Sequence, residues 1–256
     1  MSAEKTALLE KRDGIAVITL NRPEVKNCCN NALAIALQDI MDDIEEDKKC
    51  FAAVIHGAGG NFSTGADLKE AASGVKRVKL RRGGFGCFIQ PLRKPTIAAV
   101  EGYAVGGGFE LLLTCDMVVA ASNAKFGLPE VKHNLVAVGG GLFRLPKKIP
   151  YNIAMEMALT GKIHGVEFLQ PHGLLNRIVE PGSALNSALE LAKSILVNGP
   201  TALAASKQIM SKAFEWPELE AWENQTPLAG VAFNSRDRIE GLKAFSEKRA
   251  PVWSGE

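Results

Sequence analysis

The first sixty residues alternate between short apolar runs and one amphipathic stretch. The segment ALLEKRDGIAVITLNRP, residues 7–23, places Asp13 and Gly14 between two apolar runs, which predicts a β-hairpin. The segment NNALAIALQDIMDDIEED, residues 30–47, repeats apolar positions at helical spacing. A branched apolar run, FAAVIHGAGG at residues 51–60, follows that helix and ends in glycines. The predicted order is therefore strand, strand, helix, strand.

The alternation continues further along the chain. KPTIAAVEGYAVGGG, residues 94–108, is another apolar run that ends in glycines. VKHNLVAVGGGLFRLPKKIP, residues 131–150, reads as loop and helix, and IHGVEFLQPHGLLNRIVEPG, residues 163–182, as a short helix and a strand. Such alternation predicts an α/β fold with a mainly parallel sheet, helices packed outside it, and sites at the loops beyond the carboxyl ends of the strands.

Only helical patterns follow the Asn-Gly-Pro breaker at 198–200, in TALAASKQIMSKAF and SRDRIEGLKAFSEK. The sequence therefore predicts two parts. Residues 1–198 form the α/β core with the site, and residues 199–256 form a helical region.

Composition and charge narrow the class of protein. The chain has 256 residues, 46% of them apolar, and a formal charge of +2, so it can bury a large core and offers no bulk attraction to nucleic acid or membranes. No run of about 18 apolar residues occurs, and the N-terminal MSAEKTALLEKRDG carries charges where a signal peptide needs an apolar stretch. We expect a cytoplasmic protein.

The cysteines indicate neither a disulfide framework nor a metal site. They are odd in number and lack CxxC spacing. They are Cys28, Cys29, Cys50, Cys87 and Cys115. We expect reduced thiols and no metal ligands, with Cys115 buried in a helix rather than catalytic.

Residues 72–88, ASGVKRVKLRRGGFGCF, form the least structured stretch of the pattern. Five basic side chains are followed by Gly83, Gly84 and Gly86. A mobile lid and a solvated loop are both open interpretations.

Two glycine-rich turns invite comparison with nucleotide sites. GAGGNF at residues 57–62 begins like GxGxxG but has phenylalanine at the third glycine position, and no Gly-Lys-Ser/Thr of a P-loop is present. The alternative is that the glycines bring peptide N–H groups to a reacting oxygen. Residues 106–108 precede a helix pattern, where N–H groups lack partners and the dipole favours negative charge. Ala66, in the turn NFSTGADLKE, is a candidate second donor of an oxyanion hole.

Two carboxylates accompany these donors. Glu110 lies in the first turn after Gly107, and Glu130 follows Pro129 in KFGLPE. Each alone is typical of a surface or capping glutamate. Together with two N–H donors they fit a reaction in which a carbonyl is polarised, one acid activates water and the other delivers a proton.

In order and spacing, three blocks resemble the crotonase family, the enoyl-CoA hydratase/isomerase superfamily. They are NFSTGADLKE, IAAVEGYAVGGGFELLLTCDMVVAA and AKFGLPEVKHNLVAVGGGLFRLP. The resemblance runs from GIAVITLNRPEVKN to EGLKAFSEKRAPVW. It implies a ClpP-like spiral of repeated ββα units, a C-terminal helical trimerisation region, and a homotrimer or a homohexamer built as a dimer of trimers. It also implies an acyl-CoA ligand, a role in fatty acid metabolism, and no cofactor, since CoA is part of the substrate.

The resemblance also implies roles for individual residues. The N–H groups matching Ala66 and Gly107 hold the thioester oxygen. Glu110 matches the base that activates water for attack on C3, and Glu130 matches the acid that protonates C2. The CoA-binding positions implied by the match are Lys26, Ala66, Asp67, Leu68, Lys69, Gly106 and Lys248.

The presence of both glutamates favours an enoyl-CoA hydratase, because isomerases of this fold generally lack one or both. GGGFEL, FGLPEVK, GGGLFRLPKKIP and EKRAPVW also resemble carnitinyl-CoA dehydratases, which is the leading alternative. A non-catalytic RNA-binding homologue is disfavoured, because VKRVKLRR lacks interleaved aromatic residues. One departure is Asn134, which stands where typical short-chain hydratases have glycine, and asparagine tolerates the left-handed backbone that the turn needs. The acyl group and the conformation of residues 71–90 stay open.

Overall fold

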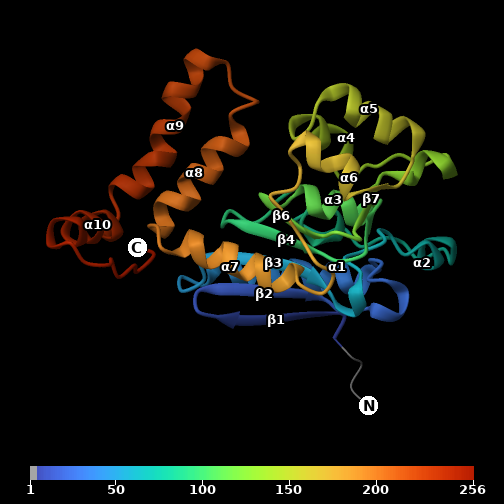
Figure 1. Cartoon of the computed structure of the whole chain (residues 1–256), viewed down its shortest axis with the longest axis horizontal. Helices are drawn as coiled ribbons and strands as arrows, with labels where there is room; N and C mark the ends of the chain where they lie inside the picture. Colours follow the sequence, from blue (N-terminus) through green and yellow to red (C-terminus); the bar gives the residue numbers. More distant parts are fainter. Residues whose placement is uncertain (1–4) are drawn as a thin grey trace.

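A six-stranded sheet forms the centre of the protein in the computed structural model, which describes residues 5–256 (Figure 1). The strands lie in the order β1-β2-β3-β4-β6-β9; β1 and β2 are antiparallel, and all other neighbours are parallel. Their bounds are β1 (Ala7–Arg12), β2 (Ile15–Leu20), β3 (Ala52–Gly57), β4 (Thr96–Val100), β6 (Met117–Ala121) and β9 (Arg177–Val179). The hairpin and the parallel sheet predicted from the sequence are confirmed.

A small second sheet stands beside the first. Its strands are β5 (Tyr103–Val105), β7 (Lys125–Gly127) and β8 (His164–Gly165), with β7 in the middle. Strands β4 and β6 belong to the large sheet, and the strands that follow them, β5 and β7, belong to the small one. A spiral of ββα units requires this arrangement. The fold class inferred from the resemblance is thus present.

The helices lie around these sheets and beyond them. The first group is α1 (Asn31–Glu46), α2 (Leu68–Ala72), α3 (Gly107–Leu113), α4 (Gly141–Arg144), α5 (Tyr151–Thr160) and α6 (Val166–Leu169). The second group is α7 (Ala184–Leu196), α8 (Pro200–Lys212), α9 (Glu218–Phe233) and α10 (Arg236–Glu247). None of the helices between residues 5 and 256 is long and apolar enough to cross a membrane.

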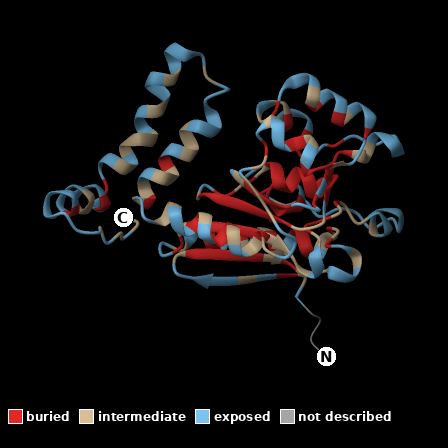
Figure 2. Cartoon of the chain, viewed as in Figure 1, coloured by how far each residue is buried: buried red, intermediate tan, exposed pale blue. Residues whose placement is uncertain are grey.

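Both faces of the inner strands β2, β3, β4 and β6 are buried, which explains their nearly continuous apolar runs. Along β2, Ile15 and Val17 pack in the cluster that α7 covers, whereas Ala16 and Ile18 belong to the larger cluster with α1 and α3. Figure 2 shows this buried centre in red. The glycine turns at the ends of β3 and β5 are therefore attached to rigid elements.

Helices α8, α9 and α10 stand away from the sheet, at the opposite end of the molecule from α2 (Figure 1). They are largely exposed in Figure 2 and carry many exposed large apolar side chains. These are Met210, Leu219, Trp222, Val231, Phe233, Ile239, Leu242 and Phe245. An apolar surface of this kind is typical of an interaction surface. The division of the chain near residue 198 remains a prediction.

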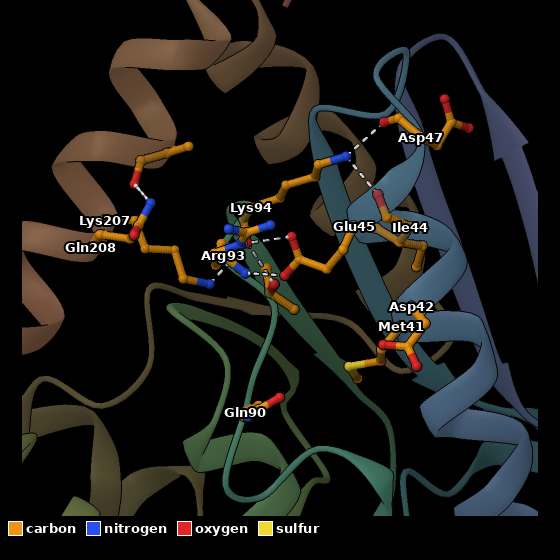
Figure 3. A network of polar contacts seen from close by, with 12 residues as sticks. Met41, Asp42, Ile44, Glu45, Asp47, Gln90, Arg93, Lys94, Lys207 and Gln208 are labelled. Atoms are coloured by element: carbon orange, nitrogen blue, oxygen red, sulfur yellow. Dashed lines mark hydrogen bonds and ion pairs between the residues drawn. The ribbon is translucent and has the colours of Figure 1, made fainter. Parts of the chain in front are cut away.

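A polar network attaches α8 to the core (Figure 3). Lys94 Nζ donates to the carbonyl oxygens of Ile44 and Asp47 at the C-terminal end of α1, at 2.5 and 2.6 Å. Lys207 Nζ on α8 donates to the Lys94 carbonyl at 2.8 Å and lies 2.7 Å from Asp116 Oδ2. Asp116 also accepts from the Thr96 N–H, so its role is structural.

Lys207→Met is expected to lower the free energy of unfolding by about 2 kcal/mol, because the Lys94 carbonyl and the Asp116 carboxylate lose their charged donor. The midpoint of thermal unfolding should fall by roughly 4 to 8 °C. Lys212→Met, at an exposed position of the same helix, is the control and should change little. Equal midpoints for both variants would contradict this role of Lys207.

The stretch at residues 72–88 divides into two halves. Residues 73–79 are exposed, but Arg82, Phe85, Cys87 and Phe88 are buried, so a lid or a solvated loop is the wrong description of the second half. The second half packs on α1, which the basic and glycine-rich composition does not reveal. Two of the five basic residues, Arg81 and Arg82, pair with Asp42, which reduces the charge that a nucleic acid would meet.

Candidate active site

The glycine triplet turns the chain from β5 into α3. Gly106 has φ 55° and ψ −132°, a backbone that favours glycine, and α3 begins at Gly107. The hydrogen bonds found within residues 5–256 use neither the Gly107 N–H nor the Ala66 N–H. Both groups are therefore available to an oxygen of a ligand.

The turn that carries Ala66 lies directly against this helix start. A Cβ built on Gly65, where φ is +90°, would lie only 2.8 Å from the Gly107 nitrogen. Cys29 holds the turn by donating its N–H to the Gly65 carbonyl and accepting from the Asp67 N–H. The structure therefore brings the two predicted donors together from segments about forty residues apart.

Asp67 builds the turn. Its carboxylate caps α2 by accepting from the N–H groups of Lys69 and Glu70, and it pairs with Arg22 Nη1 at 2.9 Å. The Arg22 guanidinium also donates to the Cys28 carbonyl. Sequence reasoning missed Arg22, although it lies four residues before Lys26 in the NRPEVKN segment.

Glu110 lies one turn into α3 and is only 4% exposed. Its Oε1 accepts from the Gly141 N–H at 2.9 Å. Burial raises the pKa of the Glu110 carboxyl, while the N–H groups of Gly141 and Gly139 and the charge of Arg144 oppose that rise.

Glu130 faces the same glycine turn from the loop after β7. A Cβ on Gly106 would meet Glu130 Oε1 at 3.2 Å, so the carboxylate lies over the residue that precedes the donor Gly107. Glu130 Oε2 is buried and has no hydrogen-bond partner. Burial raises the pKa of Glu130, and the neighbouring charge of Glu110 raises it further. An unpartnered buried oxygen of this kind is suited to a bound water or to a proton that it carries itself.

A second glycine triplet, Gly139 to Gly141, was missed as a part of the site. Its signal resembles that of the first triplet, since glycines again precede a helix, α4. Arg144 on α4 donates from Nη1 to the Gly139 carbonyl at 3.0 Å and from Nη2 to the Phe88 carbonyl. It thereby holds the loop whose N–H groups orient Glu110.

Asn134 has φ 54°, so the left-handed turn expected there is confirmed.

The remaining predicted CoA positions are more scattered. Lys26 lies next to the Ala66 turn, since its carbonyl accepts from the Thr64 N–H and its Nζ lies 4.9 Å from the centre of the Tyr103 ring. Leu68 and Lys69 are exposed on α2. Lys248 ends α10, at the far end of the molecule, so the chain does not bring it to its own site (Figure 1).

Two further expectations from the sequence concern the cysteines and metal binding. Cys115 is buried as expected, but it lies in the bend after α3, which ends at Leu113, and its thiol is directed to the Leu111 carbonyl of that helix. Across residues 5–256, no group of three His, Cys, Asp or Glu side chains is arranged to hold a metal ion.

The raised pKa of Glu130 has a consequence for stability. The folded chain binds this proton more tightly than the unfolded chain, so the associated stability is complete below the unfolded pKa and is lost as pH rises through the folded pKa. Glu130→Gln replaces the carboxyl with an amide that cannot ionise, so folding at pH 7 no longer requires this site to bury a charge or to take up a proton, and the unfolding midpoint is expected to rise by about 2 to 4 °C.

The measurement is thermal unfolding of both proteins at pH 7 and pH 4. The gain should shrink at pH 4, where more of the wild-type carboxyl is protonated, and Glu156→Gln, at an exposed position of α5, should give none. A gain of the same size at both pH values would mean that the charge is not its cause.

The chain is similar to known proteins over nearly its whole length. The family model described as enoyl-CoA hydratase/isomerase matches residues 10–256. Carnitinyl-CoA dehydratases of Shigella flexneri and Escherichia coli K12 are each 40% identical to the chain, over 96% of its length and 97% of theirs.

Solved structures match at the level of the whole fold. An enoyl-CoA hydratase of Mycobacterium tuberculosis H37Rv is 45% identical with a TM-score of 0.95, covering 99% of this chain and 100% of that one. A probable enoyl-CoA hydratase/isomerase of Mycobacterium abscessus is 48% identical, with the same TM-score and coverage. A carnitinyl-CoA hydratase of Mycobacterium avium is 36% identical with a TM-score of 0.79, again over 99% and 100% of the two chains. The chain therefore belongs to the enoyl-CoA hydratase/isomerase family and has the crotonase fold.

Proposed function

We propose that the protein is a hydro-lyase that reversibly adds water across the 2,3 double bond of a 2-enoyl-CoA thioester. The observation that carries this proposal is the meeting of a buried carboxylate, Glu110, and a half-buried one, Glu130, with two N–H groups that have no partner among residues 5–256, at one helix start. Each group has a part in one reaction, and the reaction needs no metal or redox cofactor.

In the proposed mechanism, the thioester oxygen accepts hydrogen bonds from the N–H groups of Ala66 and Gly107. Water attacks C3, its proton passes to Glu110, and the electrons of the double bond move to form an enolate on the thioester. The enolate then takes a proton at C2 from Glu130. The two N–H groups stabilise the charge that develops on the oxygen, and one such donor is typically worth about 3 kcal/mol of barrier.

The environments of the two acids support this division of labour. Burial raises the pKa of both carboxyl groups. At Glu110 the N–H groups of Gly141 and Gly139 and the charge of Arg144 oppose the rise, which suits this residue to the role of base. At Glu130 the charge of Glu110 adds to the rise, and Oε2 lacks a partner among residues 5–256, which suits this residue to the role of acid.

For CoA we propose a position along the Ala66 turn and α2, with Lys26 and Lys69 near its phosphates and Asp67 maintaining the turn.

Lys248 can contribute only from a neighbouring subunit, because it ends α10 far from α2. That placement and the exposed apolar side chains of α8 to α10 support a homotrimer or a dimer of trimers. Sedimentation of the purified protein tests the assembly; a monomer would contradict it. A cytoplasmic location and a role in fatty acid metabolism also belong to this proposal.

A second candidate substrate is crotonobetainyl-CoA, since several relatives that are 40% identical are named carnitinyl-CoA dehydratases. The same chemistry applies, because the double bond is again conjugated to a thioester. The candidates differ in the acyl group, which is cationic in the second case.

The test is to incubate the protein with crotonyl-CoA, longer 2-enoyl-CoAs and crotonobetainyl-CoA, and to follow the loss of the conjugated thioester absorbance. Turnover of crotonyl-CoA supports the hydratase, and faster turnover of crotonobetainyl-CoA supports the second candidate. No turnover of any of them would contradict the proposed function.

A further inference from the structure

Phe85 has a backbone conformation that aromatic residues rarely adopt. Its φ is 54° and its ψ is 12°, in the left-handed region, although Gly84 and Gly86 stand on either side of it. A bulky residue in this region is strained, and such strain persists only where the surroundings hold it. The side chain is 7% exposed, so the strained backbone serves to place a buried ring.

The surrounding segment is firmly attached to α1. Gly86 lies so close to α1 that a Cβ on it would clash with the Ala34 carbonyl oxygen. Just before the glycines, Arg82 is buried; its N–H donates to Gln38 Oε1 and its guanidinium binds Asp42. The backbone of Phe85 is therefore part of a fixed structure and not of a movable lid.

The Phe85 ring lies on the residue that offers the first oxyanion donor. A Cβ added to Gly107 would be 2.6 Å from the Phe85 Cζ, so the ring covers the Cα of Gly107. The ring also stacks on Phe88, with centroids 4.7 Å apart and planes inclined by 21°.

Phe88 extends this aromatic pair toward the carboxylates. A Cβ on Gly139 would clash with the Phe88 ring and would lie 2.6 Å from Glu110 Oε2. The pair therefore runs from the Gly107 N–H, which we assign to the thioester oxygen, to the loop beside Glu110, which we assign to C3. In the proposed function, the acyl carbons from the thioester to C3 lie along this aromatic surface.

We propose that Phe85, with Phe88 stacked on it, forms one wall of the acyl site between the thioester carbon and C3 and restricts the enzyme to short, compact acyl groups. This inference rests on the proposed function and adds to it the size of the substrate. A flexible aliphatic residue would yield to a longer chain, whereas a ring on a fixed, strained backbone and stacked on Phe88 does not. If Phe85 only fills the core, its removal will lower stability without changing the preference for chain length.

The test compares wild type, Phe85→Ala and Phe85→Gly with crotonyl-CoA and 2-decenoyl-CoA. Wild type should prefer the short substrate, and both variants should shift the ratio of kcat/KM toward the long one by about tenfold or more, since one methylene in an apolar pocket already changes specificity by about tenfold. Phe85→Gly also relieves the left-handed strain, so it should unfold at a higher temperature than Phe85→Ala and still show the shift. Phe214→Ala, which truncates an exposed phenylalanine, is the control and should leave the ratio unchanged.

Binding measurements test this inference independently of the proposed reaction. Calorimetry with butyryl-CoA and decanoyl-CoA, which carry no double bond, should show tighter binding of the short ester to wild type and a gain for the long ester in Phe85→Gly. These results would support the wall even if no enoyl-CoA were hydrated, in which case only the hydratase proposal would fail. Equal binding of the two esters by wild type, or a ratio that neither variant changes, would overturn it.

Discussion

Glu110→Gln and Glu130→Gln are each expected to reduce kcat for crotonyl-CoA about a thousandfold, while the protein still binds butyryl-CoA. Glutamine occupies nearly the same volume but neither accepts a proton from water nor donates one to C2, and a positioned acid or base typically contributes about 10² to 10⁴ in rate. In Glu110→Gln, the Gly141 N–H can still bond to the side-chain carbonyl of the introduced amide, so the loop should keep its place. The measurement is steady-state kinetics with calorimetric binding of butyryl-CoA.

The pH dependence separates the two roles. In wild type, kcat/KM should fall at low pH as the base becomes protonated and at high pH as the acid loses its proton. Glu156→Gln on the exposed face of α5 is the control for the loss of one negative charge and should keep both limbs and the full rate. Full activity of either active-site variant would remove that residue from the mechanism.

Local patterns account for the parts of the fold that the sequence predicted. The β1–β2 hairpin follows from Asp13 and Gly14 between apolar runs, and α1 from its helical spacing. Helix α7 received no assignment, although Ala184, Ala188 and Ala192 recur at the four-residue spacing of one helix face. Helix α9 was also missed, because Pro227 interrupts it and none of its residues is buried in the isolated chain.

The candidate site also contains residues that local patterns reveal and contacts that they do not. The candidate donors Gly107 and Ala66 and the candidate base Glu110 each stand in a short recognisable pattern, so the sequence alone singled them out. The bond from Gly141 to Glu110 joins residues 31 positions apart, and the Arg22–Asp67 pair joins residues 45 apart, so no local pattern reports them. The position of Phe85 was harder still to predict, because positive φ favours a glycine and not an aromatic residue. Its position follows only from the packing of the segment on α1.

Gly65→Ala is expected to reduce kcat for crotonyl-CoA by about 10² to 10³, the effect of losing an oxyanion donor. The added Cβ would lie 2.8 Å from the Gly107 nitrogen and 3.0 Å from the Val105 carbonyl oxygen, both backbone atoms, so the two donor segments must separate. The variant should also unfold at a lower temperature, because φ at this position is +90° and left-handed strain costs about 1 to 3 kcal/mol.

Gly182→Ala isolates the effect of geometry from that of strain. Gly182 has φ +87°, nearly the same as Gly65, but a Cβ there meets no atom within 4 Å. It should therefore cost similar strain while leaving kcat close to that of wild type. The comparison requires kcat and the unfolding midpoint of both variants, measured below the temperature at which either begins to unfold. If the two variants lost activity equally, general destabilisation would explain the effect; if Gly65→Ala kept its full rate, the paired N–H groups of Ala66 and Gly107 would not be the oxyanion hole.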